Sequence, residues 1–216
     1  MRLSLLNNLC CPNCRGDLTL NYFEAESNQN ELIDGFLICK SCGSYPVVNG
    51  ISVLLPRRFS NIGECAIRKK VSEDGFKRIN DYHKLYDIHH FRTLSQIRIH
   101  SYLKTLTLHN DQKNRILDIG VGWGLNYLPF VPDIDLWGLD FSFESLLLLK
   151  KIYEKEGRLV PTLICASLNA IPLIDLKFNL VWSSQVYQHI SDVKAIESSF
   201  DYIISFHPEI DNFKRV

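Results

Sequence analysis

The chain has 216 residues, of which 46% are hydrophobic and 22% charged, and its 24 basic and 24 acidic residues give a net charge of zero. These proportions are typical of a folded globular protein and exclude a disordered, collagenous or low-complexity chain. No apolar run approaches the ~18 residues of a membrane-spanning helix, so we expect no membrane partner. The zero net charge offers no global argument for nucleic-acid binding.

The first residues are apolar, but Asn7 and Asn8 interrupt them too early for a secretory signal peptide. We therefore expect a cytoplasmic protein, in which cysteines stay reduced and disulfides are rare.

Five of the seven cysteines fall within the first 42 residues and include two C-x-x-C pairs. Two such turns brought together supply four thiolates, the tetrahedral ligand set that Zn²⁺ prefers. The predicted zinc ligands are Cys11, Cys14, Cys39 and Cys42. Cys10 is an alternative ligand to Cys11, but only Cys11 has the two-residue gap to Cys14. Four protein ligands leave no position for a substrate, so the metal is expected to be structural. Cys65 and Cys165 are expected to be isolated thiols.

A small zinc-ribbon β domain is predicted over residues 1–56, too short for a large core without a metal. Residues 45–55 read as two strands joined by an Asn49-Gly50 turn. Gly16 and Gly43 follow the cysteine pairs, where tight turns favour the backbone freedom of glycine. Further strands are expected at residues 18–20 and 36–38.

Residues 57–112 are predicted to be a helical connecting segment, because their apolar residues recur at helical spacing. Residues 56–110 hold 11 basic residues, 5 acidic residues and five histidines. Such an excess is usual for a solvated helix face. The alternative is a surface for an anionic partner such as RNA.

The most informative stretch runs from residue 115 to residue 124, where a short apolar strand leads into a glycine-rich loop and a helix start. Its glycines are Gly120, Gly122 and Gly124. Glycines let the backbone approach a ligand closely. A dinucleotide fingerprint would need its last glycine where Leu125 stands, which disfavours an NAD-linked oxidoreductase. A carboxylate at Asp118 would repel a pyrophosphate and attract an amino group.

A second strand over residues 136–140 ends in Asp140, which can accept both hydroxyls of a ribose. Phe141 is placed to lie against a base. A helix over 144–156 and strands over 159–165 and 178–183 follow, and this alternation predicts a parallel α/β sheet.

Ligands bind at the carboxyl ends of parallel strands, so the polar residues that follow the strands should converge. The groups expected to converge are Gly120–Gly124, Asp140, Ser167 and Ser183–Gln185, the last range including Ser184.

The segments LDIGVGWG, WGLDFS and NAIP ahead of FNLVWSSQVYQHI resemble class I S-adenosylmethionine-dependent methyltransferases of the type 11 group, over residues 113–192. The segment CPNC … CKSCGSYPVVNGISVLLP resembles zinc ribbons fused to such domains, including some ribosomal-RNA guanine methyltransferases. The resemblance implies a Rossmann-like methyltransferase domain over residues 113–216, with S-adenosyl-L-methionine as cofactor. It implies that Asp118 and the three glycines hold the methionine part, that Asp140 holds the ribose, and that Ser167 and Leu168 face the adenine.

The chain departs from the family pattern in two ways. Ser167-Leu168 stands where the family usually has Asp-Ala, and a serine bonds adenine less strongly than a carboxylate. Only 24 residues follow Asp192, few for a seven-stranded sheet, which raises the alternative of a truncated member. A helical period predicts a helix over residues 193–204, with a fifth strand at 202–206 as the alternative. Without that strand, the fourth strand would be an exposed edge.

Methyl transfer requires little beyond alignment of donor and acceptor. His189 follows the fourth strand and is a weak candidate for a general base, the alternative being a packing residue. The leading hypothesis is therefore a methyltransferase with an unidentified acceptor, RNA or a small molecule. The alternative is a degenerate, non-catalytic cofactor-binding or partner protein.

Overall fold

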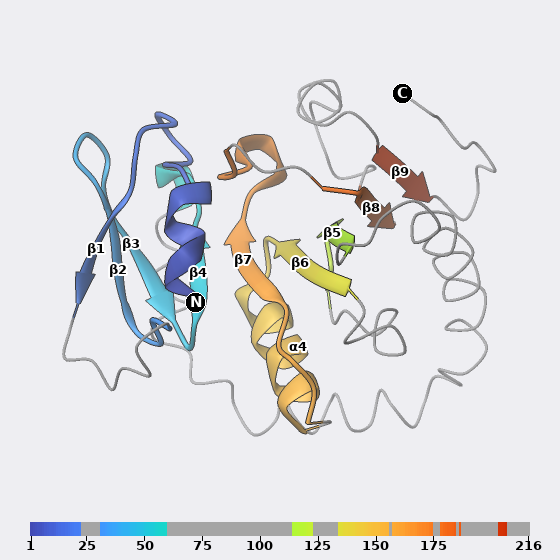
Figure 1. The fold of residues 1–216 in the computed structure, drawn as a ribbon. Coiled ribbons are helices and arrows are strands. Elements are labelled where there is room, and N and C mark those ends of the chain that lie inside the picture. Colours follow the sequence, from blue (N-terminus) through green and yellow to red (C-terminus); the bar gives the residue numbers. More distant parts are fainter. Residues whose placement is uncertain are drawn as a thin grey trace.

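The computed structural model describes residues 1–22, 31–59, 114–122, 134–155, 157–174, 178–184, 186 and 203–206. Across these residues, nine strands form one mixed sheet in the order β1-β2-β3-β4-β7-β6-β5-β8-β9 (Figure 1). The helices predicted over residues 60–112 lie outside the described residues and stay predictions, whereas the helix predicted over 144–156 is confirmed as Phe143–Lys155.

The N-terminal ribbon, residues 1–22 and 31–56, contains an antiparallel meander at one end of the sheet. Its strands are β1 (Thr19–Tyr22), β2 (Gly35–Cys39), β3 (Gly43–Val48) and β4 (Ile51–Leu54). Asn49 and Gly50 join β3 to β4 with φ angles of 52° and 75°, as a two-residue hairpin turn requires. The strands predicted around the cysteines are therefore confirmed.

The two cysteine turns differ in where they use left-handed backbone. In the second turn the left-handed residue is Gly43, with a φ of 89°, as the sequence predicted. In the first turn the left-handed residue is Arg15, with a φ of 63°, and not Gly16. An added Cβ on Gly16 would lie 3.3 Å from the Sγ of Cys14, so this glycine keeps space beside a cysteine instead.

The second part, residues 114–206, supplies five neighbouring parallel strands. Its elements are β5 (Asn114–Ile119), β6 (Ile134–Asp140), α4 (Phe143–Lys155), β7 (Thr162–Ala166), the short 3-10 helix η4 (Leu168–Ala170), β8 (Leu180–Ser184) and β9 (Ile203–Phe206). The predicted parallel α/β sheet is thus confirmed, and each predicted strand is present within a few residues of its expected bounds.

The last strand corrects two expectations. Ile203 and Ile204 lie in β9 and not in the predicted helix, while residues 193–202 lie outside the described part. Because β9 pairs in parallel with β8, the fourth parallel strand is not an exposed edge. A short apolar run fits a helix period and a strand alternation equally well, and the β-branched pair here favours the strand.

The ribbon and the second part share one sheet, which the sequence did not indicate. Strand β4 pairs in parallel with β7, with Ser52 opposite Ile164 and Leu54 opposite Ala166. Figure 1 shows the two strands side by side at the junction. Without β4, strand β7 would end the parallel part with unpaired backbone groups.

Two core layers, one on each face of the sheet, run across this junction. The first core layer joins Leu37 and Leu54 of the ribbon to Leu117 and Leu139 of the second part. The second core layer packs α4 against β4, β6 and β7, and residues of β5 and β8 belong to the same layer. A ribbon too small for its own core therefore completes it with the second part.

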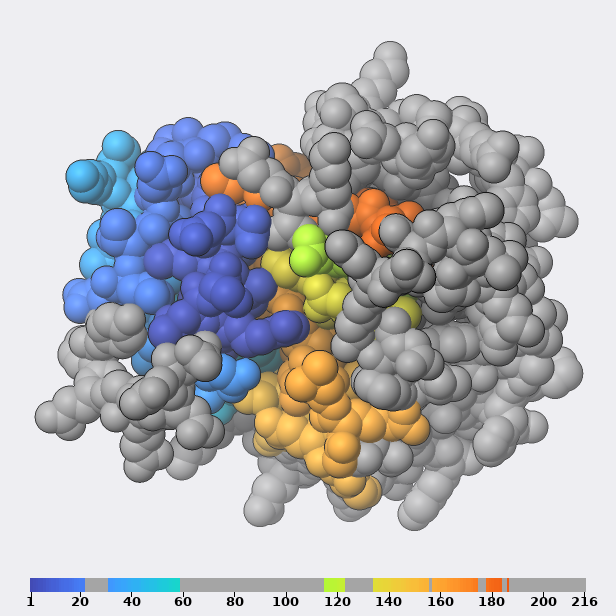
Figure 2. Space-filling view, in the orientation of Figure 1, coloured from blue at the N-terminus to red at the C-terminus, as the bar shows by residue number. Residues whose placement is uncertain are grey.

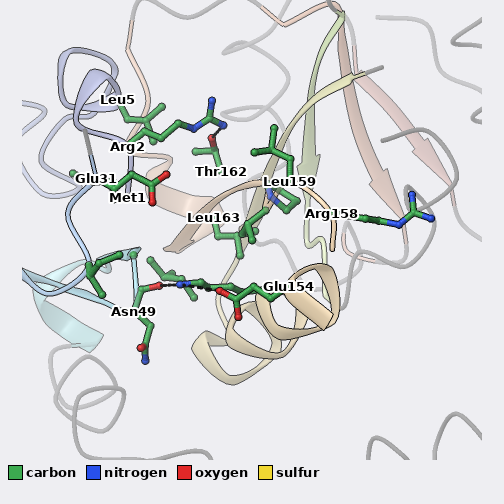
Figure 3. A pocket seen from close by; sticks show the side chains of 16 residues that line it. Met1, Arg2, Leu5, Glu31, Asn49, Glu154, Arg158, Leu159, Thr162 and Leu163 are labelled. Atoms are coloured by element: carbon green, nitrogen blue, oxygen red, sulfur yellow. Dashed lines mark hydrogen bonds and ion pairs between the residues drawn. The ribbon is translucent and has the colours of Figure 1, made fainter. Parts of the chain in front are cut away.

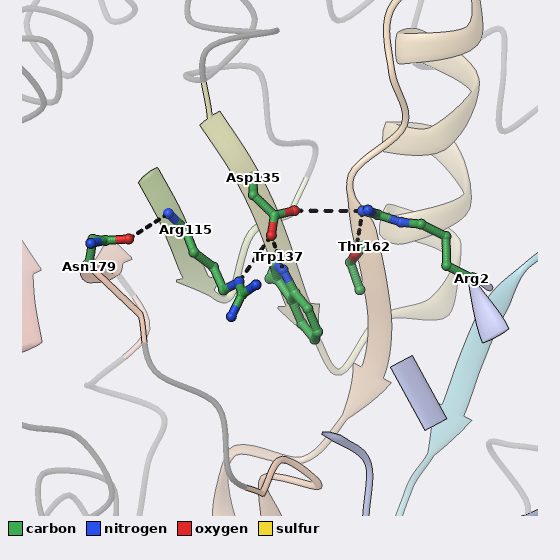
Figure 4. Close-up of polar contacts among 6 residues, drawn as sticks. All are labelled: Arg2, Arg115, Asp135, Trp137, Thr162 and Asn179. Atoms are coloured by element: carbon green, nitrogen blue, oxygen red, sulfur yellow. Dashed lines mark hydrogen bonds and ion pairs between the residues drawn. The ribbon is translucent and has the colours of Figure 1, made fainter. Parts of the chain in front are cut away.

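The first residues of the chain cover the first core layer through η1 (Leu3–Asn8). Arg2 anchors their start, because its guanidinium donates to the hydroxyl of Thr162 at 2.8 Å and pairs with Asp135 at 3.6 Å (Figure 4). Asp135 also accepts from Arg115 at 3.0 Å. In Figure 2 this N-terminal segment, in dark blue, lies directly against residues of the second part.

Candidate cofactor and metal sites

The four predicted zinc ligands come together. The Sγ atoms of Cys11, Cys14, Cys39 and Cys42 all lie within 4.8 Å of one another. Zn–S bonds of about 2.3 Å in a tetrahedron would place the sulfurs about 3.8 Å apart, so only small adjustments are needed. The cluster therefore fits a zinc ribbon.

Hydrogen bonds around the first turn change the pKa values of the cysteine thiols. The Tyr45 hydroxyl lies 3.2 Å from the Sγ of Cys11 and accepts a hydrogen bond of 2.6 Å from the Asn13 amide. Burial raises the pKa of Cys11, but hydrogen bonds from Tyr45 and from backbone amides outweigh it and lower that pKa to about 6. The hydrogen bond with Cys14, followed by burial, raises the pKa of Cys42 to about 12. A metal that binds here must therefore displace the proton of Cys42.

The second site lies where four adjacent parallel strands end. Strands β5, β6, β7 and β8 run in the same direction, so their carboxyl ends meet at one edge of the sheet. There, Asp140 accepts a hydrogen bond of 2.9 Å from the backbone N–H of Gly122 through Oδ2. Its other carboxylate oxygen accepts from the N–H of Ser142 at 2.7 Å. The structure therefore brings the predicted ribose carboxylate into contact with the predicted glycine loop.

Two of the loop glycines are required for different reasons. Gly120 has a φ of 74°, and a Cβ there would lie 2.2 Å from Cγ2 of Val186. Gly122 has a φ of 51°, and among the described residues nothing lies within 4 Å of the position its Cβ would take. Gly120 thus permits close packing, while Gly122 adopts the left-handed backbone from which its N–H reaches Asp140. Gly124 lies outside the described residues.

Asp118 lies inside the sheet, on β5, and only 5% of its surface is exposed. It stands opposite Gly138 and Trp182 on the neighbouring strands. Burial raises the pKa of Tyr153, and the charge of Asp118 raises it further, which places this carboxylate within electrostatic reach of α4.

The residues predicted to surround the base are spread over two strand ends. Phe141 follows β6 and is partly exposed, as a stacking surface requires. Ser167 follows β7 but is buried, and its Oγ accepts from the N–H of Asn169 at 3.4 Å. Leu168 is half-buried and packs against the first core layer.

At the end of β8, Ser183 is fully buried and stands opposite Ile119. Within the described residues, its Oγ has no hydrogen-bond partner. Ser184 ends β8, but its side chain is not described, and Gln185 and His189 lie outside the described residues.

A cavity of about 390 Å³ lies elsewhere, beside the amino end of β7 and between the ribbon and α4 (Figure 3). Its Lys150 is already engaged, with the carbonyl of Asn49 at 2.7 Å and the carboxylate of Glu154 at 3.5 Å. Because Gly122 and Asp140 lie at the opposite strand ends, this cavity is separate from the candidate cofactor site.

Two family models match the parts of the chain that contain these sites. Residues 116–204 match the family model described as a methyltransferase domain. This part of the chain is therefore similar to a methyltransferase domain. Residues 2–50 match the model described as Trm112p-like protein, and the four-cysteine cluster lies within them. The Rossmann-like fold class expected for the methyltransferase domain is confirmed.

Solved structures of methyltransferases are similar to parts of the chain. PKMT2 from Rickettsia typhi, in complex with AdoHcy, is 28% identical, with 37% of this chain and 16% of that chain covered and a TM-score of 0.32. The plantazolicin methyltransferase BamL, in complex with a triazolic desmethylPZN analog and SAH, is 22% identical, with 56% of this chain and 47% of that chain covered and a TM-score of 0.43. An S-adenosylmethionine-dependent methyltransferase from Clostridium acetobutylicum is 20% identical, with 62% and 56% covered and a TM-score of 0.42.

The chain thus spans less than two thirds of the length of each of these three neighbours. No protein of curated function matches it significantly. In the part of the chain that the structure describes, no helix combines the length and the apolar character needed to span a bilayer.

Proposed function

We propose that the methyltransferase domain binds S-adenosylmethionine at the edge formed by Gly122 and Asp140, and catalyses methyl transfer to an RNA or small-molecule acceptor. The observation that supports this most directly is the hydrogen bond between the Asp140 carboxylate and the backbone N–H of Gly122 at the carboxyl ends of adjacent parallel strands. Ligands of this fold class bind at that edge.

Asp140, Phe141 and Gly122 each have a part in this proposal. The bound cofactor would supply a methyl group carried on a positively charged sulfur. Asp140 uses one lone pair on each oxygen for backbone amides, so further lone pairs remain for ribose hydroxyls. Phe141 offers a ring face to the adenine, and Gly122 lets the backbone approach the ligand. The proposed roles of Asp118 and Gly124 rest on the sequence pattern and the family resemblance, and those of Ser184 and Gln185 rest on their position at the end of a parallel strand.

We further propose that the four cysteines hold one structural Zn²⁺ and that the ribbon orders the edge of the methyltransferase sheet. Support comes from the mutual distances of the sulfurs and from the Tyr45 hydroxyl, which can donate to a Cys11 thiolate. Zinc thiolates and reduced cysteines suit a reducing compartment such as the cytoplasm.

Calorimetric titration of the chain with S-adenosylhomocysteine and S-adenosylmethionine, with NAD as a control ligand, tests the proposal. Asp140→Ala removes two charge-assisted contacts and should weaken binding about 10- to 100-fold. Asp135→Ala is the matched control, because Asp135 lies at the other end of β6 and bonds Arg115 and Trp137. Equal affinities for the wild type and Asp140→Ala would contradict the site.

Transfer of a labelled methyl group to RNA and small-molecule fractions of a cell extract then tests catalysis. Labelling of one fraction identifies the acceptor class. Tight cofactor binding without transfer to any fraction would favour the non-catalytic alternative, which the serine at position 167 first suggested. Absence of binding in a folded sample would contradict the proposed function.

A further inference from the structure

The segment that follows Ser167 is held on its far side by the first cysteine turn. The N–H of Cys10 donates to the carbonyl of Pro172 at 3.1 Å, and the N–H of Ile174 donates to the carbonyl of Asn8 at 3.1 Å. Leu9 and Leu173 stand opposite one another as an antiparallel bridge. The backbone ahead of the cysteine pair thus forms a short ladder with residues 172–174.

Arg15 adds the side-chain part of this attachment. It lies between Cys14 and Gly16 in the first turn, and its guanidinium donates to the carbonyl of Ile171 and, at 2.9 Å, to that of Leu173. One planar guanidinium therefore bridges two carbonyls two residues apart, which fixes the path of the segment.

The conformation of the cysteine turn determines where Arg15 points. The N–H of Arg15 donates to the carbonyl of Cys11 at 2.9 Å, and the N–H of Cys11 donates to the carbonyl of Gly16 at 2.9 Å. Arg15 also has a positive φ, which a non-glycine residue adopts only when its surroundings enforce it. Sulfur ligation by a metal on both sides of this turn would hold it in that form.

The attached segment leads back to the candidate cofactor site. Cys165 of β7 stands opposite Asp140 of β6, and Ser167 is two residues further along. The turn Leu168–Ala170 follows, so it is fixed at one end by β7 and at the other by the backbone ladder and the Arg15 guanidinium. If the Arg15 contacts are lost, only the ladder, which begins at Pro172, still holds that end of the turn.

We propose that Arg15 is a positioning residue that couples the four-cysteine site to cofactor affinity, by holding the segment after Ser167 in place. The inference rests on the proposed function, since it concerns S-adenosylmethionine binding. Coupling of two binding sites is reciprocal, so the factor by which metal strengthens cofactor binding equals the factor by which cofactor strengthens metal binding. Typical couplings are about 5- to 150-fold.

The test compares wild type, Arg15→Ala and Arg57→Ala, all as zinc-loaded full chains. Arg57 is the matched control, because its guanidinium donates to the Cys42 carbonyl of the second turn at 2.9 Å. We expect Arg15→Ala to weaken S-adenosylhomocysteine binding about 10-fold in calorimetry, and to speed amide hydrogen exchange in residues 167–174. Arg57→Ala should leave both close to wild type.

The rate at which a chelator removes zinc supplies a readout that a general loss of stability would not reproduce. Saturating S-adenosylhomocysteine should slow zinc release from the wild type and from Arg57→Ala, and should have little effect on Arg15→Ala. The coupling would be overturned, and the proposed function kept, if Arg15→Ala bound the cofactor as tightly as the wild type. The same holds if the cofactor slowed zinc release equally in Arg15→Ala and the wild type. Absence of cofactor binding by the wild type would overturn the proposed function and the coupling together.

Discussion

At the scale of single residues, the glycine loop shows which requirements of the site are visible in a sequence. The spacing of Gly120 and Gly122 indicated a ligand loop, and the structure gives both a positive φ. That Gly120 also makes room for Val186 depends on a chain segment more than 60 residues away, which spacing cannot indicate. Arg15 and Tyr45 escaped the sequence analysis for a similar reason, because their partners lie on other elements.

Ser167 is a residue whose position could be predicted from the sequence but whose hydrogen bond could not. Its position after β7 was read from the family pattern, and the structure places it at that strand end. Its Oγ, however, accepts a backbone amide of the following turn. Local hydrogen bonds of this kind compete with ligand contacts, and the residue type alone does not show which one prevails.

Cys165 gives a prediction of pH dependence. It is buried in the second core layer, and burial, with a smaller contribution from Asp140, raises its pKa to about 12. The unfolded chain releases this proton near pH 9, so between pH 9 and 12 the unfolded state binds fewer protons than the folded state. The free energy of unfolding should therefore fall as pH rises above 9, by about 2 kcal/mol at pH 10.5.

Denaturant unfolding of the wild type and of Cys165→Ala at several pH values between 8 and 10.5 measures this effect. The variant starts from a lower stability because it loses buried sulfur contacts, but it should decline less steeply with pH. Parallel decline in the two proteins would show that Cys165 does not titrate as its burial indicates.

At the scale of elements, strand alternation and turn residues were sufficient to locate most of the sheet. The Asn49-Gly50 turn and the apolar runs of β5, β6 and β7 gave strands near their observed bounds. The order of the strands was harder to predict. The pairing of β4 with β7 could not be predicted from the sequence. All four residues of β4 are buried, so its pattern of apolar residues does not indicate which strand it pairs with.

Leu54 tests how much this shared edge stabilises the chain. It lies in β4, is fully buried, and belongs to the first core layer. Leu54→Ala should cost about 2–5 kcal/mol of unfolding free energy. The three tryptophans lie at positions 123, 137 and 182, all beyond the ribbon, so intrinsic fluorescence reports the second part.

The expected result is an earlier fluorescence transition for Leu54→Ala, although the substitution lies in the ribbon. Leu159→Ala provides the control, because 62% of Leu159 is exposed and its truncation should change stability by less than about 0.5 kcal/mol. An unchanged fluorescence transition in Leu54→Ala would mean that the two parts unfold independently.

At the scale of the whole molecule, the shared sheet and shared core layers predict one cooperative unfolding transition. Elemental analysis should find one zinc per chain, and removal of that zinc with a chelator should lower the tryptophan unfolding midpoint as well as disorder the ribbon. Metal ligation contributes folding free energy directly, so the shift should be large. Cys165→Ala, which removes a thiol outside the cluster, should retain full zinc content. Two separate transitions, only one of them sensitive to chelator, would contradict this prediction.

The pairing of β4 with β7 also dictates an order of assembly. The ribbon hairpins join residues close together in sequence, whereas Ser52 and Ile164 are more than 100 residues apart. Contacts of such long separation form late, because closing the intervening loop costs conformational entropy. During synthesis the ribbon hairpins can form early, with β4 as an open edge, while the ribbon core is completed only when the second part joins it. Strand β4 then offers the edge with which β7 pairs, and the other parallel strands follow β7 in the sheet.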